Sequence, residues 1–255
     1  MEQATVRDRE LVEFRHTYYS LFVRFWWREP PVEFITALQE DITDRIDAAA
    51  AVHPLMGEGW QSIQRSLGER ASEEVAEEFT HLFLGPFGTQ VNPYESYYLT
   101  GHLFKAPLVS LRGFLKRVGL EKREDEFAEP EDVLAFELEV MRWLIGKQMT
   151  GENPEEKTRW LQLQADFLKE HLLVWAPTCA QDIESAEGAN FYRGAALILR
   201  GFLEVERFLF REWGVDKIVS LEEARLRHGA DPTWKGPMFD VPGDEPEASF
   251  PPKNK

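Results

Sequence analysis

The chain is poor in the residues that most often carry metal and redox chemistry. It has a single cysteine, Cys179, among 255 residues, so no disulfide can form within it and no cysteine-based metal cluster is available. None of its six histidines lies four residues from another, which excludes a helical pair of metal ligands of the His-Glu-x-x-His type. We expect a buried, inert thiol at Cys179 and no metal site.

The sequence also lacks the short motifs of common enzyme families. It has no Gly-x-x-x-x-Gly-Lys phosphate loop, no Gly-x-Gly-x-x-Gly turn and no Gly-x-Ser-x-Gly nucleophile elbow. We therefore expect a protein that is not an enzyme. The enzymatic alternative is a nucleotide-dependent hydrolase built around the carboxylates near Glu131, and GTP turnover that an Asp132→Asn variant lost would support it.

Positive charge is scarce, because 45 acidic residues face 29 Lys and Arg, for a net charge of −16. Such a chain is repelled by phosphate backbones, so we expect no nucleic-acid binding. A basic partner such as a cationic peptide is favoured, although solubility alone also accounts for the charge. No apolar run reaches transmembrane length, and the charged start from Met1 to Glu10 does not resemble a secretory signal. These features predict a cytoplasmic protein without membrane insertion.

Apolar residues recur at helical spacing nearly throughout, which predicts an all-α fold. Ser72, Asn153 and Ser220 are the predicted N-caps of three helices, and Gly119 is a predicted left-handed C-cap. The helix that begins after Asn153 is predicted to end at about Trp175, and the next one to span roughly residues 191–213.

The segment from Glu121 to Glu131 is dense in charge, contains Pro130, and is the predicted hinge between two helical halves. The expected organisation is an N-terminal helical half over residues 1–120, a hinge loop over 121–131 and a C-terminal half over 132–229. A mobile, acidic, proline-rich tail is expected over 230–255. Because helical halves joined by a linker can exchange between protomers, a homodimer is left open.

Two segments stand outside the apolar stripes. The loop Asn92-Pro93-Tyr94-Glu95-Ser96 and its flanks carry three tyrosines, a residue type that is enriched at binding hot spots. An aromatic loop packed on the core is the equal alternative. Glu129-Pro130-Glu131-Asp132 brings carboxylates together, but on its own it reads as a solvated acidic first turn of a helix.

These segments belong to an ordered set of motifs. The set comprises Glu78-Phe79-x-x-Leu82-Phe83-x-Gly85-Pro86, Pro93-Tyr94-Glu95-Ser96, Gly119-Leu120, Glu129-Pro130-Glu131-Asp132, Glu137-Leu138-Glu139-x-Met141, His171-Leu172-x-x-Trp175-x-Pro177 and Phe191-Tyr192-Arg193. In this order the sequence resembles the TorD/DmsD/NarJ family of redox-enzyme maturation chaperones. The resemblance covers residues 14–212.

The resemblance implies a cytoplasmic, TorD-like helical bundle whose partner is the catalytic subunit of a molybdopterin-dependent oxidoreductase. Such a chaperone binds the subunit's N-terminal leader, often a twin-arginine leader, and delays export until the cofactor is inserted. It requires no cofactor; a weak guanine-nucleotide or molybdenum-cofactor site is left open. A helical scaffold or regulator without leader specificity is the alternative function.

The carboxylates of the acidic motif are the candidates for the leader's arginines, and an aromatic groove is the candidate for its apolar part. The predicted peptide-binding residues are Phe83, Gly85, Pro86, Pro93, Tyr94, Glu95, Ser96, Tyr97, Tyr98, Glu129, Pro130, Glu131, Asp132, His171 and Trp175. His171 is equally well read as a hydrogen-bonded structural histidine.

Two positions depart from the family pattern. Val133 stands where family members often have a histidine, and Tyr94 stands where they often have a tryptophan. We expect Val133 to be core, and no role of that histidine carries over. Because Tyr94 and Asp132 lie off the apolar stripes, their replacement by Ala is expected to leave folding normal and to weaken leader binding.

Overall fold

The structure is a computed structural model that describes residues 2–69, 71–85, 89–123, 125 and 127–229, with side chains from residue 8 onward. Among these residues the regular elements are helices, and a single isolated antiparallel bridge joins Tyr94 to Val133. The predicted all-α class is therefore confirmed. The tail over residues 230–255 lies outside the described residues.

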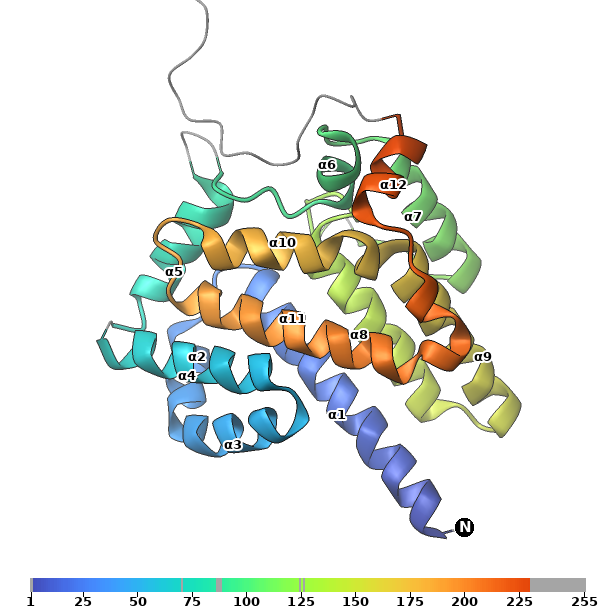
Figure 1. The fold of residues 1–255 in the computed structure, drawn as a ribbon, viewed down its shortest axis with the longest axis horizontal. Coiled ribbons are helices and arrows are strands. Elements are labelled where there is room, and N and C mark those ends of the chain that lie inside the picture. Colours follow the sequence, from blue (N-terminus) through green and yellow to red (C-terminus); the bar gives the residue numbers. More distant parts are fainter. Residues whose placement is uncertain (1, 70, 86–88, 124, 126, 230–255) are drawn as a thin grey trace, which may run out of the picture.

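The helices fall into an N-terminal and a C-terminal series (Figure 1). The first series comprises α1 (Glu2–Trp26), α2 (Val32–Glu40), α3 (Ile42–Val52), α4 (Pro54–Glu69), α5 (Glu74–Phe79), the π-helical turn η1 (Thr80–Leu84), α6 (Glu95–Thr100) and α7 (Ala106–Val118). The second comprises α8 (Leu134–Thr150), α9 (Pro154–Phe167), the π-helical turn η2 (Leu168–Leu172), α10 (Leu173–Ser185), α11 (Phe191–Leu209), the 3₁₀ turns η3 (Arg211–Trp213) and η4 (Val215–Lys217), and α12 (Leu221–Arg227).

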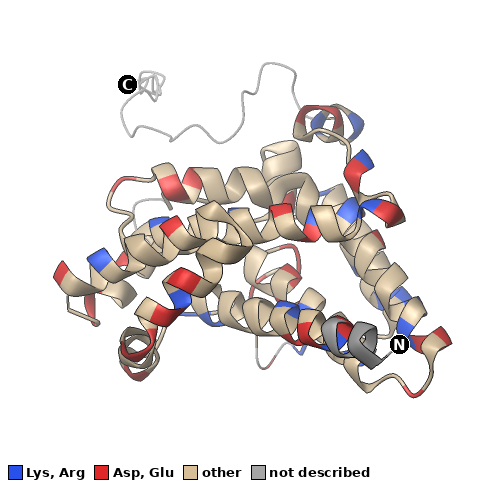
Figure 2. Ribbon diagram, turned by 60° about the horizontal axis from the view of Figure 1, so that its bottom comes forward, with Lys and Arg blue, Asp and Glu red and all other residues tan. Residues whose placement is uncertain are grey.

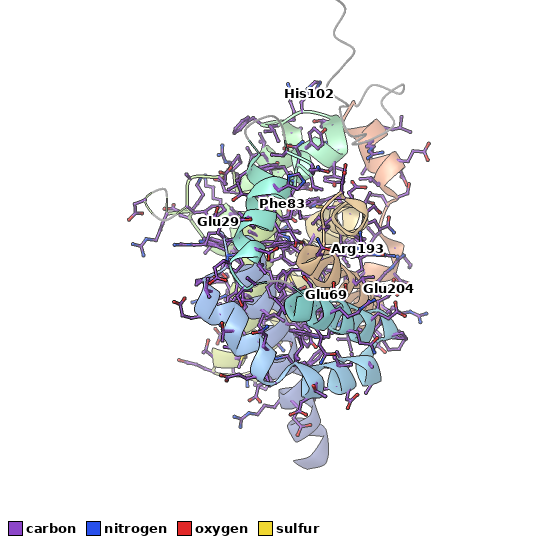
Figure 3. All side chains as sticks on the ribbon, turned by 90° about the vertical axis from the view of Figure 1, so that its left-hand side faces the viewer. Glu29, Glu69, Phe83, His102, Arg193 and Glu204 are labelled. Carbon is purple, nitrogen blue, oxygen red and sulfur yellow. The ribbon has the colours of Figure 1, made fainter. Side chains whose placement is uncertain are left out.

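Helix α11 lies at the centre of the packing. It contacts α4 along much of its length and runs beside α10, while α1 packs against α8 (Figure 1). The largest hydrophobic cluster includes residues of both series, from Tyr19 to Val215, and side chains fill the spaces between the helices (Figure 3). Acidic and basic residues are interspersed along the helices (Figure 2).

The predicted helix ends are mostly confirmed. Asn153 Oδ1 accepts a hydrogen bond from the N–H of Glu156 at 2.9 Å, and Ser220 Oγ accepts one from Glu223 at 3.1 Å. Gly119 caps α7 at φ 73°, in the left-handed region that glycine enters without strain. The prediction at Ser72 was wrong, because α5 begins two residues later and has no side-chain N-cap.

A second correction concerns the helix predicted to end at Trp175. The chain instead passes through η2 into α10, which reaches Ser185 with Pro177 inside it. Proline normally ends a helix because it lacks the N–H donor. Here Cys179, Ala180 and Ile183 continue the buried face, so packing retains the helix beyond the proline. Cys179 is buried, as expected.

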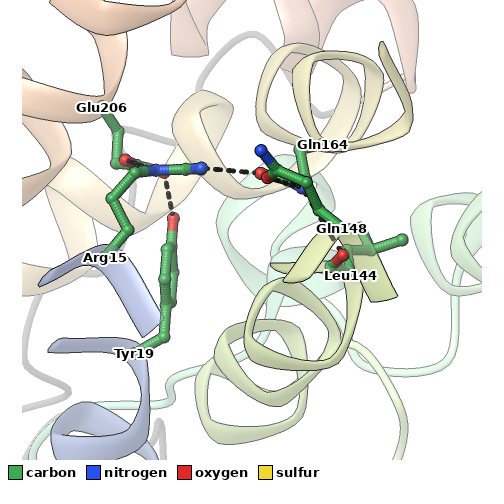
Figure 4. A network of polar contacts seen from close by, with 6 residues as sticks. All are labelled: Arg15, Tyr19, Leu144, Gln148, Gln164 and Glu206. Atoms are coloured by element: carbon green, nitrogen blue, oxygen red, sulfur yellow. Dashed lines mark hydrogen bonds and ion pairs between the residues drawn. The ribbon is translucent and has the colours of Figure 1, made fainter. Parts of the chain in front are cut away.

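A buried polar network links α1 to the second series (Figure 4). Arg15 Nη2 donates to Glu206 Oε2 at 2.7 Å, and Tyr19 donates to the same oxygen at 3.0 Å. Arg15 Nη1 also donates to Gln164 Oε1 at 2.8 Å, and Gln164 donates to Gln148 at 3.0 Å. Arg15 and Glu206 are both buried, so the network satisfies charges that would be costly to leave unpaired.

Candidate functional site

The two loop motifs meet in space. Beside the bridge between Tyr94 and Val133, the N–H of Glu95 donates to the carbonyl of Asp132, and the N–H of Leu134 donates to the carbonyl of Pro93, both at 2.8 Å. This short ladder joins segments that lie almost 40 residues apart in the sequence. It places the start of α6 beside the start of α8.

Tyr94 and Glu129 form a side-chain pair on this ladder. The Tyr94 hydroxyl donates to Glu129 Oε2 at 2.8 Å. Burial of the ring, and then the hydrogen bond to the Glu129 carboxylate, raise the pKa of Tyr94, so the hydroxyl stays protonated and remains a donor. The Glu129 side chain is exposed, and the hydrogen bond from Tyr94 holds one of its oxygens in a fixed direction.

An apolar cavity of about 390 Å³ opens beside this pair. Its walls come from the end of α1, from α5 and η1, and from the two ladder segments. It is lined by Trp26, Trp27, Arg28, Glu29, Phe79, Phe83, Leu84, Pro93, Tyr94, Phe127, Glu129, Val133, Leu134 and Ala135. The volume lies at the lower end of the range for ligand pockets, which suits a short segment of a peptide rather than its whole length. Four predicted binding residues, Phe83, Pro93, Tyr94 and Glu129, thus line one cavity.

The sequence reasoning missed the α1 wall of this cavity. The ring of Trp27 lies 4.1 Å from that of Phe127, centroid to centroid. The carboxylate of Glu29 accepts a hydrogen bond from the Thr80 hydroxyl at 2.6 Å. Glu29 and Phe83 lie at neighbouring positions on one face of the molecule (Figure 3). A usable signal was the tryptophan pair at the end of a helix, just before the prolines at 30 and 31.

Six other predicted binding residues lie behind the cavity wall: Glu95, Ser96, Tyr98, Asp132, His171 and Trp175, each at most 2% exposed. Nδ1 of His171 lies 3.1 and 3.2 Å from the two carboxylate oxygens of Glu95. Trp175 Nε1 donates to both oxygens of Glu137 at 3.1 Å, and the Tyr98 hydroxyl donates to Asp182 at 2.7 Å. His171, Trp175 and Tyr98 thus each contact a carboxyl group in the interior.

Asp132 has a defined internal contact. Its Oδ2 accepts the N–H of Ser96 at 3.0 Å, so it caps the first turn of α6 from a different segment. The interpretation of Asp132 as part of a solvated first turn was wrong, since the residue is 1% exposed. We expected Asp132→Ala to fold normally because Asp132 lies off the apolar stripes. The buried position of Asp132 removes that reason.

Glu131 is also engaged within the chain. Nε and Nη2 of Arg112, on α7, donate to its two oxygens at 3.0 and 2.8 Å. Partial burial by itself raises the pKa of Glu131. The hydrogen bonds from Arg112, a backbone hydrogen bond and the charges of Arg112 and Lys122 together outweigh burial and leave the pKa below its usual value. An incoming arginine would have to compete with Arg112 for this carboxylate.

The remaining predicted residues flank the cavity or lie elsewhere. Tyr97 is half-buried beside Tyr98, Gly85 follows η1, and Pro130 is half-buried between the two acids of its motif. Pro86 lies outside the described residues. Val133 is 7% exposed, which confirms it as core.

In the described part of the chain, no group of three His, Cys, Asp or Glu is arranged to hold a metal ion. None of the described helices is both long and apolar enough to cross a membrane.

The fold and the cavity define an all-helical protein with a small aromatic cavity at the meeting point of two loops. The chain belongs to the nitrate reductase delta subunit family, whose family model matches residues 49–181, about half of the sequence. Together with the relatives below, this confirms the resemblance to the TorD/DmsD/NarJ family.

Named chaperones are among the similar proteins. The chaperone protein TorD of Photobacterium profundum is 26% identical over 195 residues, which cover 71% of this chain and 90% of that protein. TorD of Vibrio cholerae is 31% identical over 143 residues, 56% of this chain and 64% of that protein. A probable Tat proofreading chaperone, DmsD of Haemophilus influenzae, is 27% identical over 158 residues, 60% of this chain and 67% of its own.

Proposed function

We propose that this protein is a cytoplasmic maturation chaperone that binds the N-terminal leader of a molybdopterin-dependent oxidoreductase in the cavity beside Tyr94 and Glu129. The observation that carries the proposal is the cavity itself. It combines an aromatic lining with oriented carboxylates, and the family's ordered motifs supply two of its walls. Membership of the family and the chaperone names of its relatives support the same role.

The chemistry of the cavity suits a peptide that is both apolar and basic. Trp27, Phe83 and Phe127 offer ring faces to an apolar side chain. Glu129 and Glu29, each held by one hydroxyl, offer carboxylates to guanidinium groups at the rim. The net charge of −16 attracts such a peptide from a distance.

In this proposal the chaperone covers the leader until the client has received its cofactor. A leader held in the cavity is hidden from the export machinery, so release follows maturation. Binding of guanine nucleotide or molybdenum cofactor remains a prediction from the resemblance. Assembly into a homodimer remains a prediction from the linker between the two helical halves.

Calorimetry with synthetic leader peptides tests the proposal. We expect the leader of the client oxidoreductase to bind and to bind more weakly as salt is raised, because attraction at a partly exposed rim is screened. Glu129→Gln should lower the affinity about tenfold, and Trp27→Leu should cost roughly 2 kcal/mol of binding free energy.

Matched controls separate the cavity from general effects. Glu33→Gln removes an exposed carboxylate on α2, and Trp143→Leu removes a half-buried tryptophan that packs on Trp160, away from the cavity lining. Both variants should bind the leader as the unmodified protein does. Absence of binding for every molybdoenzyme leader of the same organism, at low salt as well as high, would refute the proposal.

A further inference from the structure

Interior contacts fix the position of the cavity wall that Pro93 and Tyr94 form. Tyr94 lines the cavity, whereas the next residue, Glu95, is 2% exposed and contacts His171 in the interior. The wall therefore has two anchors. One is the backbone ladder to Asp132 and Leu134, and the other is the side-chain contact between Glu95 and His171.

His171 occupies an unusual backbone position. It lies in the π-helical turn η2, between α9 and α10, and such turns frequently occur at functional sites. Its ring lies beside those of Phe114 and Phe167, with centroids 6.1 and 5.4 Å away. Nε2 is buried and has no hydrogen-bond partner among the described residues. The polar contact of the ring is therefore the one to Glu95.

Asp132 and Glu137 are the other buried carboxyl groups nearby, but Asp132 is engaged by the N–H of Ser96 and Glu137 by Trp175. The Oγ of Ser96 is a second buried polar atom without a partner in the described structure. Glu95 thus has two polar neighbours in the interior, the His171 ring and the Glu137 carboxyl group, and of these His171 lies on η2.

We propose that Glu95 and His171 are positioning residues for peptide binding: their contact fixes the Pro93–Tyr94 wall against η2, and neither residue touches the peptide. This inference rests on the proposed function. Helix α6, which begins at Glu95, has only six residues and cannot hold its own position. A wall anchored on one side only must be ordered again on binding, which lowers affinity without removing any contact.

Hydrogen exchange and calorimetry on the full chain test this. His171→Leu removes the polar contact, while His171→Asn keeps an amide nitrogen where Nδ1 lies. In His171→Leu, the amides of Glu95, Ser96 and Leu134 should exchange at least tenfold faster, and leader affinity should fall about tenfold. His171→Asn should restore both to within a few-fold of the unmodified protein.

Two controls make the result specific. His53→Leu breaks a histidine–glutamate contact of the same type, 3.0 Å to Glu204, outside the cavity. Ile63→Val trims a buried side chain at the α4–α11 contact and lowers stability without touching the wall. Neither should change exchange at the three wall amides. Should His171→Leu fail to fold, Glu95→Leu set against Glu95→Gln repeats the comparison from the other side.

Leader binding tests the proposed function, and hydrogen exchange at the wall amides tests the positioning role. If no leader binds the unmodified protein, the proposed function falls, yet faster wall exchange in His171→Leu with rescue by His171→Asn still supports the positioning role. Unchanged wall exchange in His171→Leu overturns the inference even where leaders bind. Equal acceleration at the wall in the Ile63→Val control also overturns it, because the effect would then be general destabilisation.

Discussion

The carboxyl groups of Glu95, Asp132 and Glu137 are buried behind the cavity wall. The effect of burial on a carboxyl pKa is clearest at Glu137. Glu137 is fully buried, and Trp175 donates to both of its oxygens. Burial, followed by the charge of nearby Glu95, raises the pKa of Glu137 well above its ordinary value despite the hydrogen bond from Trp175. The folded protein therefore favours the neutral acid at this position.

This shift makes a prediction about pH. Above about pH 4.5 the unfolded chain loses the Glu137 proton while the folded chain keeps it, so stability falls as pH rises toward the folded pKa. The loss from one proton is at most about 1.4 kcal/mol per pH unit. Glu137→Gln keeps an acceptor for Trp175 and should reduce the decline in urea-unfolding free energy between pH 5 and pH 8. An identical decline in both proteins would contradict this.

Some residues of the cavity could be predicted from the sequence, but the direction of the Asp132 side chain could not. Phe83, Pro93, Tyr94 and Glu129 were predicted as peptide-binding residues through the resemblance, and the structure places all four in the lining of one cavity. Asp132 belongs to the same motif, but it points into the interior. That difference follows from the ladder with residues 93–96, which brings distant segments together and which no local pattern encodes.

At the scale of elements, α4 and α11 approach most closely at two glycines. A Cβ added at Gly59 would lie 2.6 Å from the carbonyl oxygen of Gly194 and 2.6 Å from Cγ1 of Ile198, which is too close for real atoms. The absence of side chains there lets the two helix backbones touch. Glycines ordinarily weaken a helix, and here the close contact that they permit stabilises α4.

Substitution at the crossing should therefore be costly. Gly59→Ala should lower the free energy of unfolding by about 1–3 kcal/mol, because the helices must move apart or tilt. Gly113→Ala on α7 is the matched control, since a Cβ there meets nothing within 4 Å. It should raise stability by up to about 1 kcal/mol through helix propensity. Equal effects of the two substitutions in urea unfolding would show that the crossing is not tight.

Helix ends were predictable where a side chain caps its own helix, as at Asn153 and Ser220. They were not predictable where the stabilising group is distant. Helix α6 begins with Asp132 as its cap, and α10 passes through Pro177 because its buried face packs on α11. Capping by a helix's own side chain can be read from the local sequence, whereas capping or packing by a distant segment depends on tertiary contacts.

At the scale of the whole molecule, the Arg15–Glu206 pair joins the first helix to the last long one (Figure 4). Both side chains are almost fully buried, so removing either one leaves an uncompensated charge in the interior. One hydrophobic cluster also includes residues on both sides of the predicted hinge. The chain is thus expected to unfold in one cooperative transition.

Arg15→Met should lower the free energy of unfolding by roughly 3–5 kcal/mol, because Glu206 then stays buried without its partner. The double variant Arg15→Met/Glu206→Leu should recover most of this loss, since no unpaired charge remains. Thermal melts followed by circular dichroism and by tryptophan fluorescence should coincide for all three proteins. A double variant less stable than the single one would contradict the account.

Site-specific cross-linking in the cell tests whether an oxidoreductase leader binds in the cavity beside Tyr94 and Glu129. Leu84 lines the cavity and is 54% exposed, and Phe208 on α11 is 68% exposed and does not line it. A photoreactive phenylalanine analogue is placed at either position in the full chain, and the adducts are identified by mass spectrometry. We expect a molybdopterin oxidoreductase joined through its N-terminal leader at position 84 and not at 208. The same products at both positions, or adducts at 84 without such a leader, would contradict this expectation.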